Sequence, residues 1–279
     1  MIADFDNASF VRVVATLEPY RDELVVIGGW ANRLCRLHPL ALAQVFPPLR
    51  TLDADIATPM RIRKRAATLR QLLVQQGFRE ELSGEEDPPR AEYHLGSKGE
   101  SVYVQFVAPL EGGAADRRGR STATTRILGV TAERLRYVDV LLVAPWTIEL
   151  THANGFPVGS TPLLVKICNP VAYIVQKILA LPKRRAEQRA KDVLYIHDTL
   201  LVFGGAVDQL EKLWTSTVRP SLSVRAIKTV LQAPQTVFGG VTDDLRGAAI
   251  QARSASGRSL DADRVAAVCR FGLARVLAS

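Results

Sequence analysis

Cysteine and histidine are scarce in this chain of 279 residues, which contains three cysteines and four histidines. Cys35, Cys168 and Cys269 are far apart and odd in number, and no zinc-site spacing is present. This pattern is typical of reduced core thiols in a cytoplasmic protein without disulfides. The histidines are scattered, and we expect His197, in a helical stretch, to be packed and not catalytic.

Long apolar runs, internal repeats and low-complexity tracts are also absent. No run approaches the ~18 apolar residues that a membrane span needs, and the acidic residues 1–6 lack the basic start of a secretion signal. With 47% apolar and 23% charged residues, the composition is that of a soluble globular protein. We therefore expect a cytoplasmic location and no membrane partner.

Positive charge is in excess: 36 lysines and arginines against 28 acidic residues give a net charge of +8. The basic residues gather in three clusters: Arg61, Arg63, Lys64 and Arg65; Arg117, Arg118 and Arg120; and Lys183, Arg184, Arg185, Arg189 and Lys191. Such clusters attract polyanions, including nucleotide phosphates and RNA. Solvated helix faces carry the same residues, so both interpretations stay open.

Residues 25–57 show the most informative pattern in the chain. The apolar run at 25–27 predicts a strand, Gly28 and Gly29 a tight turn, and the amphipathic residues 30–37 a helix. After a proline-rich break, residues 50–57 predict a second strand. The sequence thus indicates a strand, a glycine turn, a helix and a strand in succession.

The second strand carries Asp53 and Asp55, two positions apart. Because strand side chains alternate between faces, both carboxylates are expected on one face, with Ala54 and Ile56 on the other. Two aligned carboxylates suit a divalent cation that prefers oxygen ligands. The alternative is a surface strand with two solvated aspartates after an unrelated glycine turn.

An apolar strand ending in Gly-Gly and followed by Asp-x-Asp resembles the nucleotidyltransferase superfamily. The closer resemblance is to the bacterial branch that contains abortive-infection-type toxins and related uncharacterised nucleotidyltransferases. The matching residues are Gly28, Gly29, Arg33, Leu34, Arg50, Thr51, Asp53 and Asp55. The resemblance implies Mg²⁺ or Mn²⁺ at the two aspartates and a nucleoside triphosphate whose phosphates lie at the two glycines. It also implies nucleotide contacts from Arg33 and Arg50.

The third strand of the superfamily usually carries a third carboxylate, but here the corresponding residue is Gln105, in the apolar run at 102–107. An amide can still offer one oxygen ligand, but it removes a negative charge from the site. The substitution leaves two possibilities open, an enzyme or a degenerate module that binds nucleotide or RNA.

A second block follows Pro170, which starts a helix. Lys177 lies on the apolar stripe of this helix, and Asp192 faces inward on the next one. The spacing resembles the second block of the same nucleotidyltransferases, which implies that both residues belong to the nucleotide site. The alternative is a buried salt bridge between Lys177 and Asp192 at a helix-pair interface.

The remaining pattern predicts the order of elements. We expect a helix at 6–18, a basic helix at 63–76 ending at Gly77, strands at 78–82, 91–95, 101–107 and 163–167, and a hairpin of 138–143 with 147–151. Residues 111–125 are expected to form a loop. After Pro170 the chain is expected to be helical, with breaks that include Pro234.

These observations predict an α/β (α+β) fold, with a small mixed sheet and flanking helices in residues 1–165 and a helical domain in residues 166–279. The expected function is metal-dependent nucleotidyl transfer, with transfer RNA as a candidate acceptor and an antitoxin protein as a candidate partner. The expected catalytic residues are Asp53, Asp55, Lys177 and Asp192. A small-molecule nucleotidyltransferase is a further alternative, although a net-basic chain is poorly suited to polycationic aminoglycosides.

Overall fold

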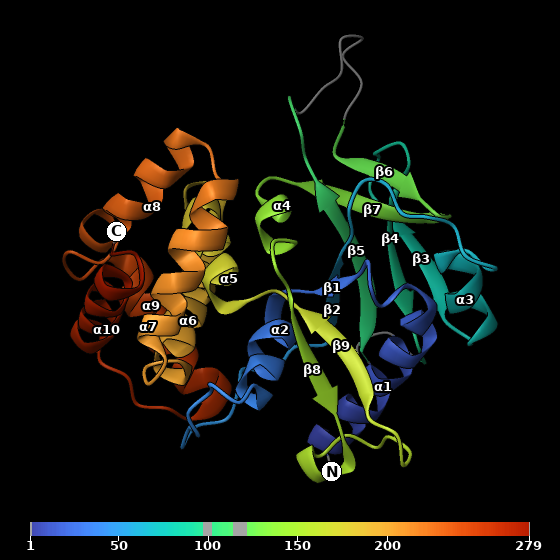
Figure 1. The fold of residues 1–279 in the computed structure, drawn as a ribbon, viewed down its shortest axis with the longest axis horizontal. Coiled ribbons are helices and arrows are strands. Elements are labelled where there is room, and N and C mark those ends of the chain that lie inside the picture. Colours follow the sequence, from blue (N-terminus) through green and yellow to red (C-terminus); the bar gives the residue numbers. More distant parts are fainter. Residues whose placement is uncertain (1, 97–101, 114–121, 279) are drawn as a thin grey trace. The chain divides into compact units, whose positions relative to one another are not determined.

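The computed structural model describes residues 2–96, 102–113 and 122–278 (Figure 1). The predicted basic cluster of Arg117, Arg118 and Arg120 therefore lies outside the described residues. Contacts divide the chain into two units, one of Met1–Ala31 with Thr51–Cys168 and one of Asn32–Arg50 with Asn169–Ser279. The predicted domains, residues 1–165 and 166–279, stay a prediction.

The first unit is built on one mixed sheet, which confirms the predicted α/β fold (Figure 1). Its described strands are β1 (Val25–Val26), β2 (Asp53–Ala57), β3 (Arg79–Ser83), β4 (Arg90–His94), β5 (Tyr103–Pro109), β6 (Thr124–Ile127), β7 (Val130–Leu135), β8 (Trp146–Leu150) and β9 (Leu163–Ile167). They follow the order β3-β4-β5-β2-β1-β9-β8, with β7 also paired to β5 and β6 to β7. The central strand β2 runs parallel to β5 and antiparallel to β1.

The helices of the first unit are short apart from the first. They are α1 (Ile2–Leu17), α3 (Leu69–Gln75) and α4 (Val138–Leu141), with 3-10 turns at Glu18–Tyr20 and His152–Asn154. The division between the units falls within α2 (Gly28–Leu34), which a 3-10 turn at Cys35–Leu37 extends. The predicted first helix is confirmed, and its apolar stripe of Phe10, Val13, Val14 and Leu17 is buried.

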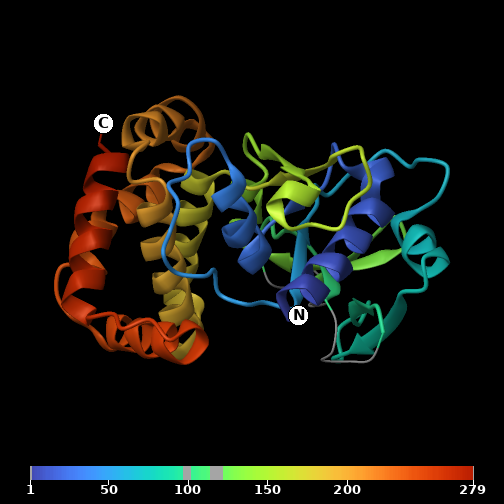
Figure 2. The ribbon, with the colours of Figure 1, turned by 90° about the horizontal axis from the view of Figure 1, so that it is seen from below.

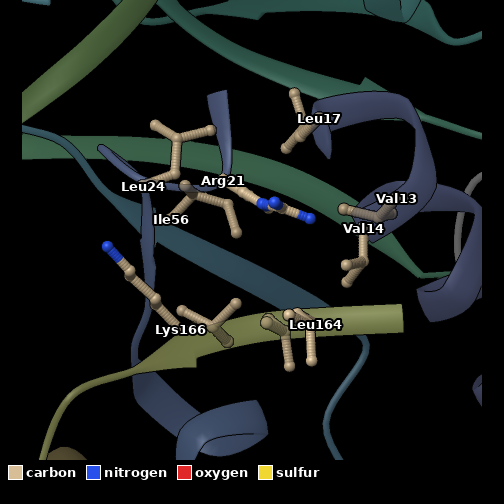
Figure 3. A pocket seen from close by; sticks show the side chains of 10 residues that line it. Val13, Val14, Leu17, Arg21, Leu24, Ile56, Leu164 and Lys166 are labelled. Carbon is tan, nitrogen blue, oxygen red and sulfur yellow. The ribbon is translucent and has the colours of Figure 1, made fainter. Parts of the chain in front are cut away.

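Helix α1 covers one face of the sheet. Figure 3 shows its valines around a small apolar hollow with Ile56 of β2 and Leu164 of β9. Phe10 of the same helix stacks on Trp30, with ring centroids 3.9 Å apart. Since Ile56 points to α1, residues 53 and 55 of β2 project to the opposite face of the sheet.

The predicted basic helix at 63–76 is wrong in its first half, because the helix begins only after Thr68. The Thr68 hydroxyl accepts from the Gln71 N–H, while the Gln71 side chain accepts from the Thr68 N–H, which forms a capping box. Upstream, the Arg65 N–H donates to the Tyr20 hydroxyl over 3.0 Å and is therefore not available for a helical hydrogen bond. Gly77, with φ +83°, follows the helix as predicted.

The predicted hairpin of 138–143 with 147–151 is also wrong. Val138–Leu141 forms the short helix α4, entered through Tyr137 in a left-handed conformation, and β8 pairs with β9 instead. A short apolar run fits a buried helix as well as a strand, which explains the error. The hairpin of this region is β6 with β7, where Arg126 pairs with Thr131.

The second unit is mainly helical, although its described residues 38–50 form no helix. Its main helices are α5 (Pro170–Ala180), α6 (Ala186–Val202), α7 (Val207–Leu213), α8 (Val224–Thr236), α9 (Asp243–Ser256) and α10 (Ala262–Val276). Helix α6 packs against α5, α9 and α10 (Figure 2). Pro234 lies inside α8, which corrects its prediction as a break. None of the helices in the described ranges has the length and apolar character to cross a membrane.

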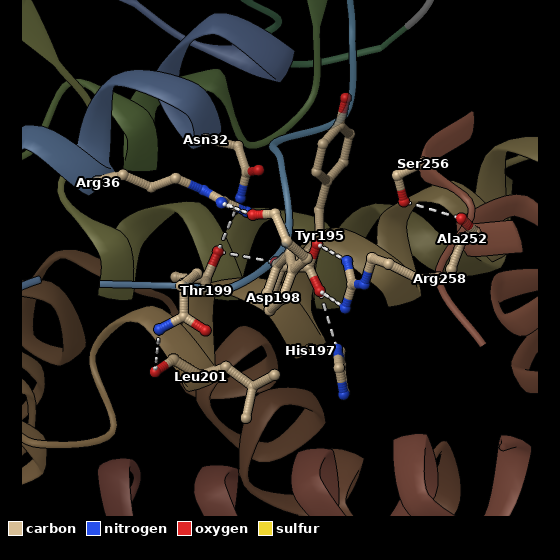
Figure 4. Close-up of polar contacts among 12 residues, drawn as sticks. Asn32, Arg36, Tyr195, His197, Asp198, Thr199, Leu201, Ala252, Ser256 and Arg258 are labelled. Carbon is tan, nitrogen blue, oxygen red and sulfur yellow. Dashed lines mark hydrogen bonds and ion pairs between the residues drawn. The ribbon is translucent and has the colours of Figure 1, made fainter. Parts of the chain in front are cut away.

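A buried carboxylate on α6 holds together distant parts of the second unit (Figure 4). Asp198 accepts from both terminal nitrogens of Arg258, over 2.7 and 2.8 Å, and lies 2.9 Å from His197 Nδ1. Although burial acts to raise the pKa of Asp198, the hydrogen bonds from His197 and Arg258 hold it below its ordinary value. Its stabilising effect is thus complete above the unfolded pKa of about 3.9 and is lost as the pH falls through the lowered folded-state pKa.

We expect Arg258→Met to lower the free energy of unfolding by about 3–5 kcal/mol, because it leaves a buried carboxylate without its main partner. The matched control is Arg246→Met, since Arg246 pairs with Asp243 on the surface, where the side chains are 61% and 97% exposed. Urea unfolding at neutral pH measures both variants. Equal losses would contradict the stabilising role of the Arg258–Asp198 pair.

Candidate functional site

The two aspartates of β2 lie on one face, as the alternation predicted. Ala54 and Ile56 are buried, whereas Asp53 and Asp55 are half-buried. The parallel register with β5 pairs Asp53 with Tyr103 and Asp55 with Gln105. The expected third-strand residue, Gln105, therefore stands beside Asp55.

The same face continues across two more strands. On β4, His94 pairs with Tyr103, and on β3, Glu81 pairs with Glu92. Because directly paired residues project to the same side of a sheet, these four side chains share the face of Asp53 and Asp55. The sequence predicted β3 and β4 as strands, but it did not predict that these side chains belong to the site, because their position depends on the pairing of β4 with β5.

Gln105 connects the aspartates to this extension. Its amide nitrogen donates to Glu92 Oε1 over 3.0 Å, so its carbonyl oxygen is directed away from Glu92. The other carboxylate oxygen of Glu92 lies 2.9 Å from His94 Nε2. The position of the missing carboxylate is thus filled by an amide that is fixed by a carboxylate on the next strand.

The face is strongly negative. Burial, followed by the charges of Asp53, Glu92 and Asp55, raises the pKa of the Tyr103 hydroxyl to about 12. Asp53 also accepts a hydrogen bond from the Thr51 hydroxyl. A concentration of carboxylates that resists a further negative charge is suited to bind cations.

The glycine turn lies directly against this face. Gly28 is the first residue of α2 and has φ +64°, a conformation that favours glycine. A Cβ atom added to it would lie 2.3 Å from Asp55 Oδ2. The Ile27 N–H also donates to the Asp55 carbonyl over 2.9 Å. The predicted glycine and aspartate motifs therefore meet, with Gly29 next in the first turn of α2.

Two of the predicted site residues, Lys177 and Asp192, form a buried ion pair within the second unit. The distance from Lys177 Nζ to Asp192 Oδ1 is 2.6 Å, and Arg184 Nε lies 3.4 Å from the other oxygen. Lys177 also lies over the rings of Tyr173 and Tyr195, 5.2 and 5.1 Å from their centroids. This is the salt bridge that sequence analysis gave as the alternative; a nucleotide contact from either residue stays a prediction.

Arg33 and Arg50 belong to the second unit, whereas the aspartates and Gly28 belong to the first. Arg33 is half-buried on α2, and Arg50 is exposed just before Thr51. Their contacts with nucleotide stay predictions.

A family model described as nucleotidyltransferase matches residues 6–218, a range that includes every predicted site residue from Gly28 to Asp192. The chain therefore belongs to this nucleotidyltransferase family. No curated protein matches it.

The contact between Gly28 and Asp55 can be tested by Gly28→Ala, with Gly77→Ala as the matched control. Both residues have positive φ, but nothing lies within 4 Å of a Cβ at Gly77. In both variants the free energy of unfolding should fall by roughly 1–2 kcal/mol, which is the cost of a non-glycine residue in the left-handed conformation. If Asp53 and Asp55 hold a divalent cation, only Gly28→Ala should also weaken Mg²⁺ binding measured by calorimetry, because it displaces the Asp55 carboxylate. Unchanged Mg²⁺ affinity in a folded Gly28→Ala protein would contradict this arrangement.

Removing one member of the buried Lys177–Asp192 ion pair should lower the free energy of unfolding more than replacing both members with apolar residues. Lys177→Ala leaves the buried Asp192 with Arg184 alone, and we expect it to lower the free energy of unfolding by about 3–5 kcal/mol. The double variant Lys177→Met with Asp192→Leu should lose less, because apolar side chains of similar size fill the space. Urea unfolding distinguishes the two; a double variant less stable than Lys177→Ala would refute the expectation.

Proposed function

We propose that this chain is a metal-dependent enzyme that transfers a nucleotidyl group from a nucleoside triphosphate to an acceptor. One observation is the basis of the proposal. Asp53 and Asp55 lie on one face of β2, and the Asp55 carboxylate lies against the glycine turn at Gly28. Membership of a nucleotidyltransferase family supports the general activity. The metal, the acceptor and the roles of individual residues are the parts that we add.

The donor set fits an oxygen-ligated divalent cation. Asp53 and Asp55 would hold Mg²⁺ or Mn²⁺, and Gln105, which is paired with Asp55 in the sheet, would offer its carbonyl oxygen as a neutral ligand. Two carboxylates suffice, because Mg²⁺ commonly arrives with phosphates and uses only one or two from the protein. When bound, the cation neutralises charge on the phosphate oxygens.

The chain's own residues would bind and orient the nucleotide. The glycines at 28 and 29 carry no side chain that would keep phosphate oxygens from the backbone. The space that a Cβ would fill at Gly28 is taken by the Asp55 carboxylate, so phosphate at this turn would lie next to a cation held by Asp55. From the resemblance, we further propose that Arg33, Arg50 and Lys177 contact phosphate. Asp192 would then position Lys177 through their 2.6 Å ion pair.

In the transfer, the acceptor oxygen forms a bond to the α-phosphorus, the bond to pyrophosphate breaks, and the proton of the acceptor hydroxyl passes to solvent water. Gln105 is not basic and supplies no proton acceptor at the usual third-carboxylate position. A positioned general base contributes ~10²–10⁴-fold in rate, so we infer a slow enzyme.

We propose an RNA end, with transfer RNA as the first candidate, as the acceptor. The support is the basic segment after β2, where Arg61, Arg63 and Lys64 are exposed. A toxin-like role with an antitoxin protein as partner rests on the sequence resemblance alone. The second candidate function is a degenerate module that binds nucleotide or RNA, and Gln105 is the residue that favours it.

The test is transfer of label from each nucleoside triphosphate to total transfer RNA in the presence of Mg²⁺. Wild-type protein should transfer label slowly, and Asp55→Ala should abolish transfer while the protein remains folded. Gln105→Glu should raise the rate by as much as the ~10²–10⁴-fold that a general base contributes. Glu149→Gln, on the exposed side of β8, is the control for loss of a carboxylate elsewhere.

The outcomes separate the candidates. Transfer by Gln105→Glu alone would identify the natural protein as a degenerate binding module. Transfer that persists in Asp55→Ala would refute the assignment of the site.

A further inference from the structure

Three potential metal ligands converge beside the aspartates, on strands that the proposed nucleotide site does not use. A carboxylate oxygen of Glu81 on β3, a carboxylate oxygen of Glu92 on β4 and an imidazole nitrogen of His94 on β4 all lie within 4.8 Å of one another. Glu81 and Glu92 are paired in the antiparallel register, and His94 is two residues further along β4. All three side chains therefore project to one face.

The imidazole is the fixed part of this group. His94 is 1% exposed and stacks on Tyr103, with ring centroids 4.9 Å apart. Its Nε2 lies 2.9 Å from Glu92 Oε2 and 3.9 Å from Glu81 Oε2, whereas its Nδ1 is buried and has no hydrogen-bond partner among the described residues. The polar contacts of this ring are thus directed to the two carboxylates, and its unsatisfied nitrogen makes it an unfavourable choice for packing alone.

Three arginines on β3, β4 and α3 form ion pairs or hydrogen bonds outside this cluster. The Arg79 guanidinium donates to the Gly96 carbonyl, and Arg90 pairs with Glu86 and Glu133. Arg70 pairs with Glu80, which faces the other side of the sheet. These contacts of the three arginines are thus with groups outside the cluster.

We propose that Glu81, Glu92 and His94 form a second divalent-metal site, separate from the Asp53 and Asp55 carboxylates. One imidazole nitrogen with two carboxylate oxygens suits Zn²⁺, Co²⁺, Mn²⁺ or Fe²⁺ better than Mg²⁺ or Ca²⁺, which prefer oxygen ligands alone. Ligands 2.0–2.2 Å from a tetrahedral ion lie roughly 3.4 Å apart. His94 Nε2 and Glu92 Oε2, which are 2.9 Å apart, would therefore separate slightly, and the partly exposed Glu81, 3.9 Å from Nε2, would move closer. Three protein ligands leave a position for water.

The site has a structural link to Gln105. The Glu92 oxygen that does not face His94 accepts from the Gln105 amide. A metal held by Glu92 would therefore fix the amide beside Asp55. The proposed binding does not depend on nucleotidyl transfer, and each can be tested without the other.

The experiment is a Co²⁺ titration of the full chain carrying Asp53→Asn and Asp55→Asn, which removes the other carboxylate pair. We expect one equivalent of Co²⁺ to bind and to give visible d–d absorption. This absorption should be lost when Zn²⁺ displaces the Co²⁺. Glu81→Gln and Glu92→Gln, each in this background, should weaken Co²⁺ binding by about 100-fold or more, beyond the 10–100-fold that loss of an outer partner costs. His94→Gln should abolish both binding and absorption.

His152→Gln and Glu149→Gln are the matched controls, because both residues are exposed in the same unit away from the cluster. They should leave affinity and absorption unchanged. Circular dichroism checks folding; if the buried His94 variant does not fold, the two glutamate variants decide. The proposal is overturned if the folded background protein binds no Co²⁺, or if Glu81→Gln and Glu92→Gln both bind it like their parent.

Discussion

The parallel pairing of β2 with β5 is the constraint on which the candidate site depends. It sets Asp53 beside Tyr103 and Asp55 beside Gln105, and it leaves Ile56 facing α1. A shift of one residue in this register would turn both carboxylates into the apolar layer. The buried alternation of Ala54 and Ile56 excludes that shift, so the same apolar residues that hold the sheet together also fix the direction of the acidic pair.

That register concentrates carboxylates on one side of the sheet, and Gln105 moderates their repulsion. Like charges directly opposite each other on neighbouring strands are destabilising. The Gln105 amide separates Asp55 from Glu92 and donates a hydrogen bond to the latter. A glutamate at this position would instead bring a third carboxylate between two others. The residue that weakens the expected catalytic pattern thus also lowers the charge repulsion on this face.

The second unit depends on buried charge of another kind. Helix α6 carries both Asp192 and Asp198, and each forms an ion pair with another segment. Asp192 pairs with Lys177 of α5, and Asp198 pairs with Arg258, which follows α9. Buried pairs of this kind contribute little net stability but penalise arrangements that separate them. They fix how α5, α6 and the segment after α9 assemble.

Local pattern in the sequence was sufficient for much of this protein. The apolar spacing of Phe10, Val13 and Leu17 gave α1, and the two-residue alternation around Asp53 and Asp55 gave β2 and the direction of its carboxylates. The glycine turn before them was also recognisable, because positive φ and close approach both require glycine. These features depend on neighbours a few residues apart, which is the range over which periodicity carries information.

Only the tertiary structure decided the rest. Val138–Leu141 became a helix, and Arg65 stayed outside one because its N–H is bound to Tyr20. Glu92 and His94 lie on the acidic face because β4 pairs with β5. Lys177 contacts Asp192 because α5 packs on α6. Each of these outcomes depends on residues that are distant in the sequence. Local spacing could therefore identify candidate side chains but not the neighbours that determine their charge state and contacts.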